Sequence, residues 1–259
     1  MTAESGRETG ERYRSFSGFL RERFGERVYK VSIDAGFTCP NRDGTLGVGG
    51  CIYCNNTGFS PNTRRDRRPV REQALDGMEY MRRRYRARRF IAYFQAYTNT
   101  YAPVERLEAL YGEALSLPDV VGLSIGTRPD CVDEKVLNLV ESYAGKYHVW
   151  LELGLQSARN RTLRFLNRGH TVETFEAAAA RAKRRRGIHV CAHVILGLPG
   201  ETRRDMLASA GVLTRAGVDG AKIHLMHVLG DTPLERMYRE GKLATFTMHE
   251  YARLVCDYL

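Results

Sequence analysis

Residues 187–198 read GIHVCAHVILGL, and their side chains alternate in character from one position to the next. The apolar positions are Ile188, Val190, Ala192 and Val194, and the intervening ones are His189, Cys191 and His193. A period of two is that of a β-strand with one apolar and one polar face. A parallel strand covered on both faces would be apolar throughout. We therefore expect one face of this strand to meet helices and the other to meet something polar.

Two further segments alternate in the same way. In 148–156, Glu152 and Gln156 alternate with leucines, and in 220–228, Lys222 and His224 alternate with apolar residues. When the apolar faces of a curled sheet meet its helices, the polar faces line the lumen. Three strands with polar faces predict a ligand cavity in that lumen rather than a packed core.

Short apolar segments recur along the chain and are separated by longer segments with helical spacing. The expected strands are 28–34, 90–95, 120–125, 148–156, 187–198 and 220–228, and the clearest helices are 104–117, 134–143, 171–185 and 201–215. Such alternation is typical of βα units around a parallel sheet and predicts an α/β fold, a full or partial barrel. We expect an N-terminal extension over 1–27 and the barrel over 28–259. The chain stops inside an expected helix, which suggests a truncated C-terminal part.

Composition places the chain among soluble globular proteins. It has 259 residues, of which 43% are hydrophobic and 27% charged, and a net charge of +10 carried mostly by arginine. Basic residues gather at 64–89 and 181–186, where they form either solvated helix faces or a contact with a polyanion such as RNA. There is no apolar leader and no apolar run of the ~18 residues that a membrane span needs. We expect a cytoplasmic protein with reduced cysteines and no membrane contact.

Cys39, Cys51 and Cys54 form a C-x11-C-x2-C pattern within the glycine-rich stretch CPNRDGTLGVGGCIYC, residues 39–54. Three thiolates can bind three irons of a cubane cluster and leave the fourth iron open. A structural zinc site needs a fourth ligand, which a distant His or Cys would have to supply. The spacing alone leaves both metals open.

The sequence resembles the radical S-adenosylmethionine (SAM) superfamily over most of its length. The matching stretches are VSIDAGFTCPNRDGTLGVGGCIYCNNTGFSP (31–61), SIGTRPD (124–130), LELGLQSARNRTLRFLNRGHT (151–171) and ILGLPGET (195–202). It is most similar to a long-spacer subfamily related to the elongator catalytic subunit and to oxygen-independent coproporphyrinogen oxidase. The resemblance implies a partial (β/α)6 TIM-like barrel and a [4Fe–4S] cluster on Cys39, Cys51 and Cys54. It also implies an enzyme that cleaves SAM reductively to a 5′-deoxyadenosyl radical, with electrons from a flavodoxin- or ferredoxin-type donor.

The resemblance assigns roles to several residues around SAM. Tyr53 matches an aromatic position beside the adenine, and Gln156 matches a glutamine that contacts the ribose. Arg168 matches an arginine that pairs with the SAM carboxylate, for which a guanidinium is well suited. His193 stands where the oxidase has a ribose-binding aspartate. The backbone around Leu196 matches a stretch that approaches the base.

Other contacts follow less directly from the pattern. Gly126 stands where the oxidase has a glutamate for the SAM amine, so Glu152 is our candidate for that contact. Gln95 and Asn99 follow the second strand and supply polar contacts in place of a glycine-rich turn. For the substrate we expect Lys222 and His224, since charged groups are rarely buried without a partner. Cys191 is either a hydrogen-atom donor or covalent site, or a small buried apolar residue.

Two function classes fit these observations. The first is a radical SAM enzyme acting on a small molecule or on tRNA, and the second is an RNA-binding protein stabilised by a metal or cluster and without turnover. The arginine clusters serve both, whereas Gln156, Arg168 and the polar lumen are explained only by the enzyme.

Overall fold

The computed structural model describes residues 13–60, 62, 63 and 68–259, in which strands and helices alternate as predicted. The strands are β1 (Val28–Ile33), β2 (Arg89–Phe94), β3 (Val120–Thr127), β4 (His148–Gln156), β5 (Ile188–Leu196) and β6 (Gly220–Leu225). The helices are α1 (Phe16–Phe24), α2 (Asn56–Phe59), α3 (Val70–Tyr85), α4 (Val104–Leu115), η1 (Pro129–Cys131), α5 (Glu134–Ala144), α6 (Asn160–Phe165), α7 (Val172–Lys183), α8 (Arg203–Ala216), α9 (Pro233–Arg239) and α10 (Met248–Tyr258).

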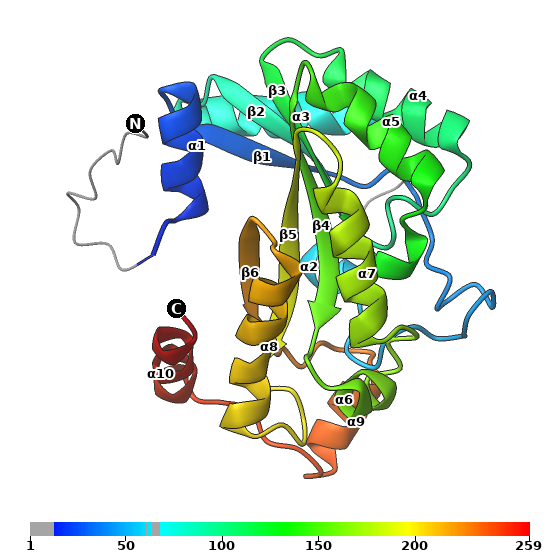
Figure 1. Ribbon diagram of the computed structural model, residues 1–259, viewed down its shortest axis with the longest axis vertical. Helices are drawn as coiled ribbons and strands as arrows, with labels where there is room; N and C mark the ends of the chain where they lie inside the picture. The colour runs from blue at the N-terminus through cyan, green and yellow to red at the C-terminus, as the bar shows by residue number, and fades with distance from the viewer. Residues whose placement is uncertain (1–12, 61, 64–67) are drawn as a thin grey trace.

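The strands form one parallel sheet in sequence order, from β1 to β6. The sheet is curled, and α4, α5 and α7 lie along one side of it (Figure 1). Within the described residues β1 and β6 pair with one neighbour each, so the barrel is a half-barrel. The predicted partial (β/α)6 barrel is confirmed.

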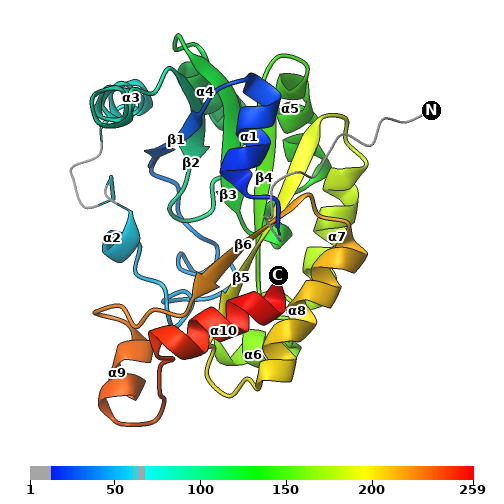
Figure 2. The ribbon, with the colours of Figure 1, turned by 90° about the vertical axis from the view of Figure 1, so that its left-hand side faces the viewer.

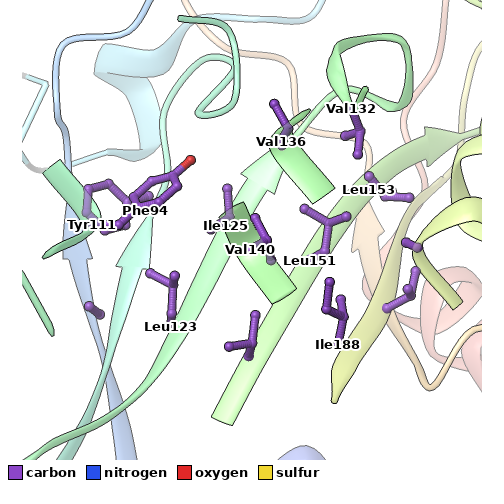
Figure 3. Packing of buried hydrophobic residues seen from close by; sticks show 14 of the residues in the cluster. Phe94, Tyr111, Leu123, Ile125, Val132, Val136, Val140, Leu151, Leu153 and Ile188 are labelled. Atoms are coloured by element: carbon purple, nitrogen blue, oxygen red, sulfur yellow. The ribbon is translucent and has the colours of Figure 1, made fainter. Parts of the chain in front are cut away.

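The outer face of the sheet carries the core, as the alternation predicts. Leu123 and Ile125 of β3 and Leu151 of β4 are fully buried. Figure 3 shows these side chains facing Val136 and Val140, which project from α5 toward the strands. Burying this apolar face stabilises the fold by about 25 cal/mol per Å² and turns the opposite face of each strand into the lumen.

Helix α1 closes the end of the lumen where the strands begin. It lies on the side of the sheet away from α5 and α7 (Figure 1), and in front of the strands when viewed from that side (Figure 2). The Phe19 ring lies 5.6 Å from His148, 5.8 Å from Trp150 and 5.9 Å from His189, measured between ring centroids. Trp150 and His189 thus pack against the helix instead of lining an open channel.

The described arginines that directly precede β2 and β5 lie at that same end, whereas Arg68 and Arg71 lie at the start of α3, near Gln73 and the end of β1. Arg82, Arg83, Arg84 and Arg86 end α3 directly before β2, and 184–186 directly precede β5. Several are paired: Arg82 with Asp119 at 2.9 Å, and Arg185 with Glu134 and Glu141. Arg64, Arg65 and Arg67 of the first cluster are outside the described residues. No helix in the described chain is both long and apolar enough to cross a bilayer.

Candidate active site

The opposite end of the lumen holds a cavity of about 500 Å³, a size typical of small-molecule sites. Its walls are the C-terminal halves of the strands and the cysteine loop, residues 39–56. All of the predicted site residues except Cys191 and Leu196 line it. They are Cys39, Cys51, Tyr53, Cys54, Gln95, Asn99, Glu152, Gln156, Arg168, His193, Lys222 and His224.

A turn at 166–169 holds the cysteine loop in place. Asn167 donates from Nδ2 to the carbonyl of Gly50 at 2.9 Å and accepts at its own carbonyl from Asn41 Nδ2. Asn167 and Gly169 have positive φ values, which form a tight turn. The turn therefore links the cysteine loop to β4 and α6, and it places Arg168 beside Cys51.

Arg168 is buried between the cysteine loop and the end of β4. Its Nη1 lies 3.8 Å from Cys51 Sγ, and its Nη2 donates to the carbonyl of Gly154 at 3.0 Å. The register of β4 against β5 shifts between Gly154 and Gln156, and Gln156 takes a φ of 72°. Such a bulge redirects a side chain, and the Gln156 side chain lines the cavity beside Arg168.

The residues around the thiols fit a cluster and a polar cofactor. Cys51 Sγ faces Nδ2 of Asn41 at 3.9 Å as well as Arg168, so its sulfur lies among donors. Five residues lining the cavity carry a buried polar atom with no partner, which a bound polar group could satisfy: Asn56, Thr98, Asn99, Arg128 and Arg168. In the described chain no three His, Cys, Asp or Glu side chains are gathered tightly enough to form a site for a metal ion.

At the closed end of the cavity Glu152 is the centre of a polar cluster. Its carboxylate accepts from Lys30 and Ser124 at Oε1 and from His193 Nε2 at Oε2, the last at 2.7 Å. Burial would raise the pKa of Glu152, but the His193 hydrogen bond and the Lys30 charge outweigh it, and the pKa lies well below the usual range. Both oxygens of this predicted SAM-amine contact are already engaged.

Two cavity-facing groups of β6 extend this cluster. His224 Nε2 lies 3.3 Å from His193 Nδ1, and Lys222 Nζ lies 3.3 Å from the Tyr93 hydroxyl and 3.9 Å from Glu152 Oε2. Burial, followed by the neighbouring His193 and Lys222, lowers the pKa of His224 to about 3. Burial also lowers the pKa of Lys222. We call Glu152, His193, Lys222 and His224 the floor cluster.

The other predicted residues have defined neighbours. Gln95 donates to Ser32 Oγ at 2.7 Å, and Asn99 donates to the carbonyl of Gly126 at 2.8 Å. Leu196 is fully buried in a cluster with residues of α8 and α10, while Ile195 faces the cavity. Burial and the nearby Glu152 raise the pKa of Cys191 to about 12, which keeps its thiol protonated.

Sequence reasoning missed several polar residues of the lumen, of which four stand out by their contacts. Lys30, Tyr93 and Ser124 surround Glu152. Arg128 lines the cavity and is held by Asp130 through two hydrogen bonds, at 2.9 and 2.8 Å. In β1, Lys30 and Ser32 alternate with Tyr29, Val31 and Ile33. This alternation is a signal that would have found Lys30.

Comparison with protein families gives two matches. The family model described as the Radical SAM superfamily matches residues 39–213, and one described as the Radical_SAM C-terminal domain matches residues 218–259. Protein YtqA of Bacillus subtilis is 41% identical over 254 residues, which are 97% of this chain and 78% of YtqA. A tRNA uridine(34) acetyltransferase of Methanocaldococcus jannaschii is 30% identical over 138 residues, covering 52% of this chain and 25% of that protein.

Solved structures share the fold. The Methanocaldococcus infernus Elp3 with an N-terminal deletion matches with a TM-score of 0.60 at 21% identity, over 85% of this chain and 50% of its own. Coproporphyrinogen III oxidase (HemN) of Escherichia coli, described as a radical SAM enzyme, matches with a TM-score of 0.58 at 17% identity, over 93% and 54%. The chain thus spans about half the length of these two structures.

Proposed function

Because this chain belongs to the radical SAM superfamily, it is an enzyme whose cofactors are a [4Fe–4S] cluster and SAM, and we propose that it uses them on a small-molecule substrate bound in the lumen. When bound, these cofactors supply one-electron cleavage of SAM to a 5′-deoxyadenosyl radical, which abstracts hydrogen from the substrate. In this proposal Cys39, Cys51 and Cys54 hold the cluster. The electrons come from a flavodoxin- or ferredoxin-type protein in the cytoplasm.

The protein's own residues orient SAM between the cysteine loop and β4. We assign the SAM carboxylate to Arg168, whose buried Nε has no partner and whose position is fixed by Gly154. We assign the ribose to Gln156, which the bulge in β4 directs into the cavity. Tyr53 lies beside both cysteines 51 and 54 and packs near Met226, which suits contact with the adenine.

The preference for a small-molecule substrate rests on the closed end of the lumen. The cavity ends on the floor cluster, and behind it the rings of α1 fill the lumen. These rings cover that side of the lumen, and limiting the access of water protects a reactive intermediate. The arginines at the end of α3, before β2, and at 184–186, before β5, lie at the far end of the strands from the cavity. A tRNA held there would not be guided to the cavity.

A tRNA substrate is the second candidate, favoured by one observation. The 30% identity to the tRNA uridine(34) acetyltransferase covers half of this chain. The position of the arginines before β2 and β5 argues against a tRNA substrate. Such a substrate would need an RNA-binding surface nearer the cavity.

Cluster ligation is tested by replacing Cys39, Cys51 and Cys54 singly with Ala and measuring iron, sulfide and visible absorbance after anaerobic reconstitution. We expect each replacement to remove most of the cluster absorbance and all reductive SAM cleavage, because a thiolate ligand is lost. Cys256→Ala is the control, since Cys256 is exposed on α10. Zinc bound one to one, with no iron after reconstitution, would refute the proposal.

A further inference from the structure

The carboxylate of Glu152 fixes which ring nitrogens of the neighbouring histidines carry hydrogen. Its Oε2 lies 2.7 Å from His193 Nε2, and because an ionised carboxylate only accepts, that nitrogen is the donor. In neutral His193 the other nitrogen, Nδ1, is then an acceptor. It lies 3.3 Å from His224 Nε2, which donates to it. The remaining ring nitrogen, His224 Nδ1, is therefore left as an acceptor on a residue that lines the cavity.

This series of hydrogen bonds from Glu152 to His224 forms only while both imidazoles are neutral. Their surroundings keep them neutral. Burial lowers the pKa of His193 and brings that of His224 to about 3. The charged and titratable groups that face His224 are Glu152 on β4, His193 on β5, Lys222 beside it on β6 and His227 beyond the strand. Lys222 opposes a second positive charge there, so His224 presents a lone pair and not an N–H at neutral pH.

Lys222 supplies a hydrogen-bond donor next to this acceptor. The Lys222 ammonium has three N–H bonds and donates to the Tyr93 hydroxyl at 3.3 Å, while its side chain is 41% exposed. Lys222 and His224 are two residues apart on one face of β6, about 6.6 Å along the strand. Both side chains line the cavity.

We propose that the floor cluster is a substrate subsite that holds a hydroxyl group of an uncharged alcohol or polyol between Lys222 Nζ and His224 Nδ1. The hydroxyl oxygen accepts from Lys222, and its hydrogen is donated to His224. An ionised carboxylate has no hydrogen to donate and would set a lone pair against that of His224, and an ammonium group would meet Lys222. Glu152 and His193 act as positioning residues. This substrate class rests on the proposed function, since the cavity is the one that receives SAM.

The test is ¹⁵N NMR of histidine-labelled protein loaded with the cluster and SAM, so that the SAM carboxylate site is already filled. We expect His193 and His224 to carry hydrogen on Nε2 and to lack it on Nδ1 at neutral pH. Adding glycerol or myo-inositol should shift the His224 Nδ1 resonance in a saturable manner. Acetate, which is fully ionised at this pH and has no hydrogen to donate, should leave it unshifted when added at matched ionic strength.

Lys222→Met should reduce the polyol affinity at least tenfold, whereas Lys135→Met, on the exposed face of α5, should leave it unchanged. Three results would overturn the subsite: hydrogen on His224 Nδ1, a saturable shift with acetate, or no shift with either polyol. Each of these is read in protein that contains iron and binds SAM. Failure to load the cluster or to bind SAM would instead count against the proposed function.

Discussion

At the scale of single residues, the site depends on a position with no side chain. A Cβ at Gly154 would lie 2.6 Å from Gln156 Nε2 and inside van der Waals contact of Arg168 Nη2. Both neighbours are assigned to SAM, and Arg168 also donates to the Gly154 carbonyl. The absence of a side chain at 154 is therefore what allows these two groups to converge.

Gly154→Ala should weaken SAM binding by about 1.5–3 kcal/mol, the contribution of a hydrogen bond to a charged group, because the methyl group displaces Arg168. Isothermal titration of the cluster-loaded protein measures this change. Gly112→Ala is the matched control: Gly112 lies inside α4 with no atom within 4 Å of an added Cβ, so SAM affinity should not change. Equal SAM affinity in Gly154→Ala and wild type would show that Arg168 does not bind SAM.

Sequence patterns located most of these residues but not their partners. Alternation placed Glu152, His193, Lys222 and His224 on one face, because the strand period is local. The pairing of Glu152 with Lys30 joins residues 122 positions apart, and it depends on how far the sheet curls. The engagement of Glu152 by Lys30, Ser124 and His193, instead of by solvent or cofactor alone, was therefore beyond sequence reasoning.

At the scale of elements, α1 was expected only as part of an extension before the barrel. Its aromatic residues in fact fill the lumen end, where Phe16 lies 5.3 Å and Phe19 5.8 Å from the Trp150 ring. No local period in 1–27 signals this contact, because it depends on the tertiary placement of one short helix. Beneath the helix, Trp150 Nε1 donates to His148 Nε2 at 2.7 Å, so His148 must keep a free lone pair.

This contact makes folding sensitive to acid. Burial, the neighbouring His189 and Arg23 lower the pKa of His148 to about 3, whereas an unfolded histidine titrates near 6.5. Between these values only the unfolded state binds the proton, so the free energy of unfolding falls as the pH drops below about 6.5, by up to about 1.4 kcal/mol per pH unit.

His148→Gln should reduce this acid sensitivity, because an amide oxygen still accepts from Trp150 and does not titrate. Urea unfolding of the cluster-loaded protein between pH 7 and pH 5 measures the slope. The control is His249→Gln, on the exposed face of α10, which should retain the wild-type slope. An unchanged slope in His148→Gln would assign the acid sensitivity to other buried histidines, such as His170.

At the scale of the whole molecule, one group of four arginines and the cavity lie at opposite ends of the half-barrel. Arg82, Arg83, Arg84 and Arg86 lie at the C-terminal end of α3, where the strands begin, and Gln156, Arg168 and the cysteine loop lie where the strands end. The net charge of +10 still attracts polyanions. Composition does not reveal where on the molecule this charge lies, since a basic segment in the sequence does not show which end of a barrel it faces.

Reversing those four arginines to Glu therefore separates binding from catalysis. We expect the affinity for tRNA to fall and its salt dependence to become shallower, because fewer phosphate counterions are released. The rate of reductive SAM cleavage should stay within about twofold of wild type, since these four arginines lie at the other end of the strands from the cavity, and added tRNA should not change that rate in either protein. The charge-conserving Arg→Lys version of the four positions is the control. If tRNA accelerates SAM cleavage in wild type and the reversal removes that acceleration, tRNA is the substrate and the small-molecule proposal fails.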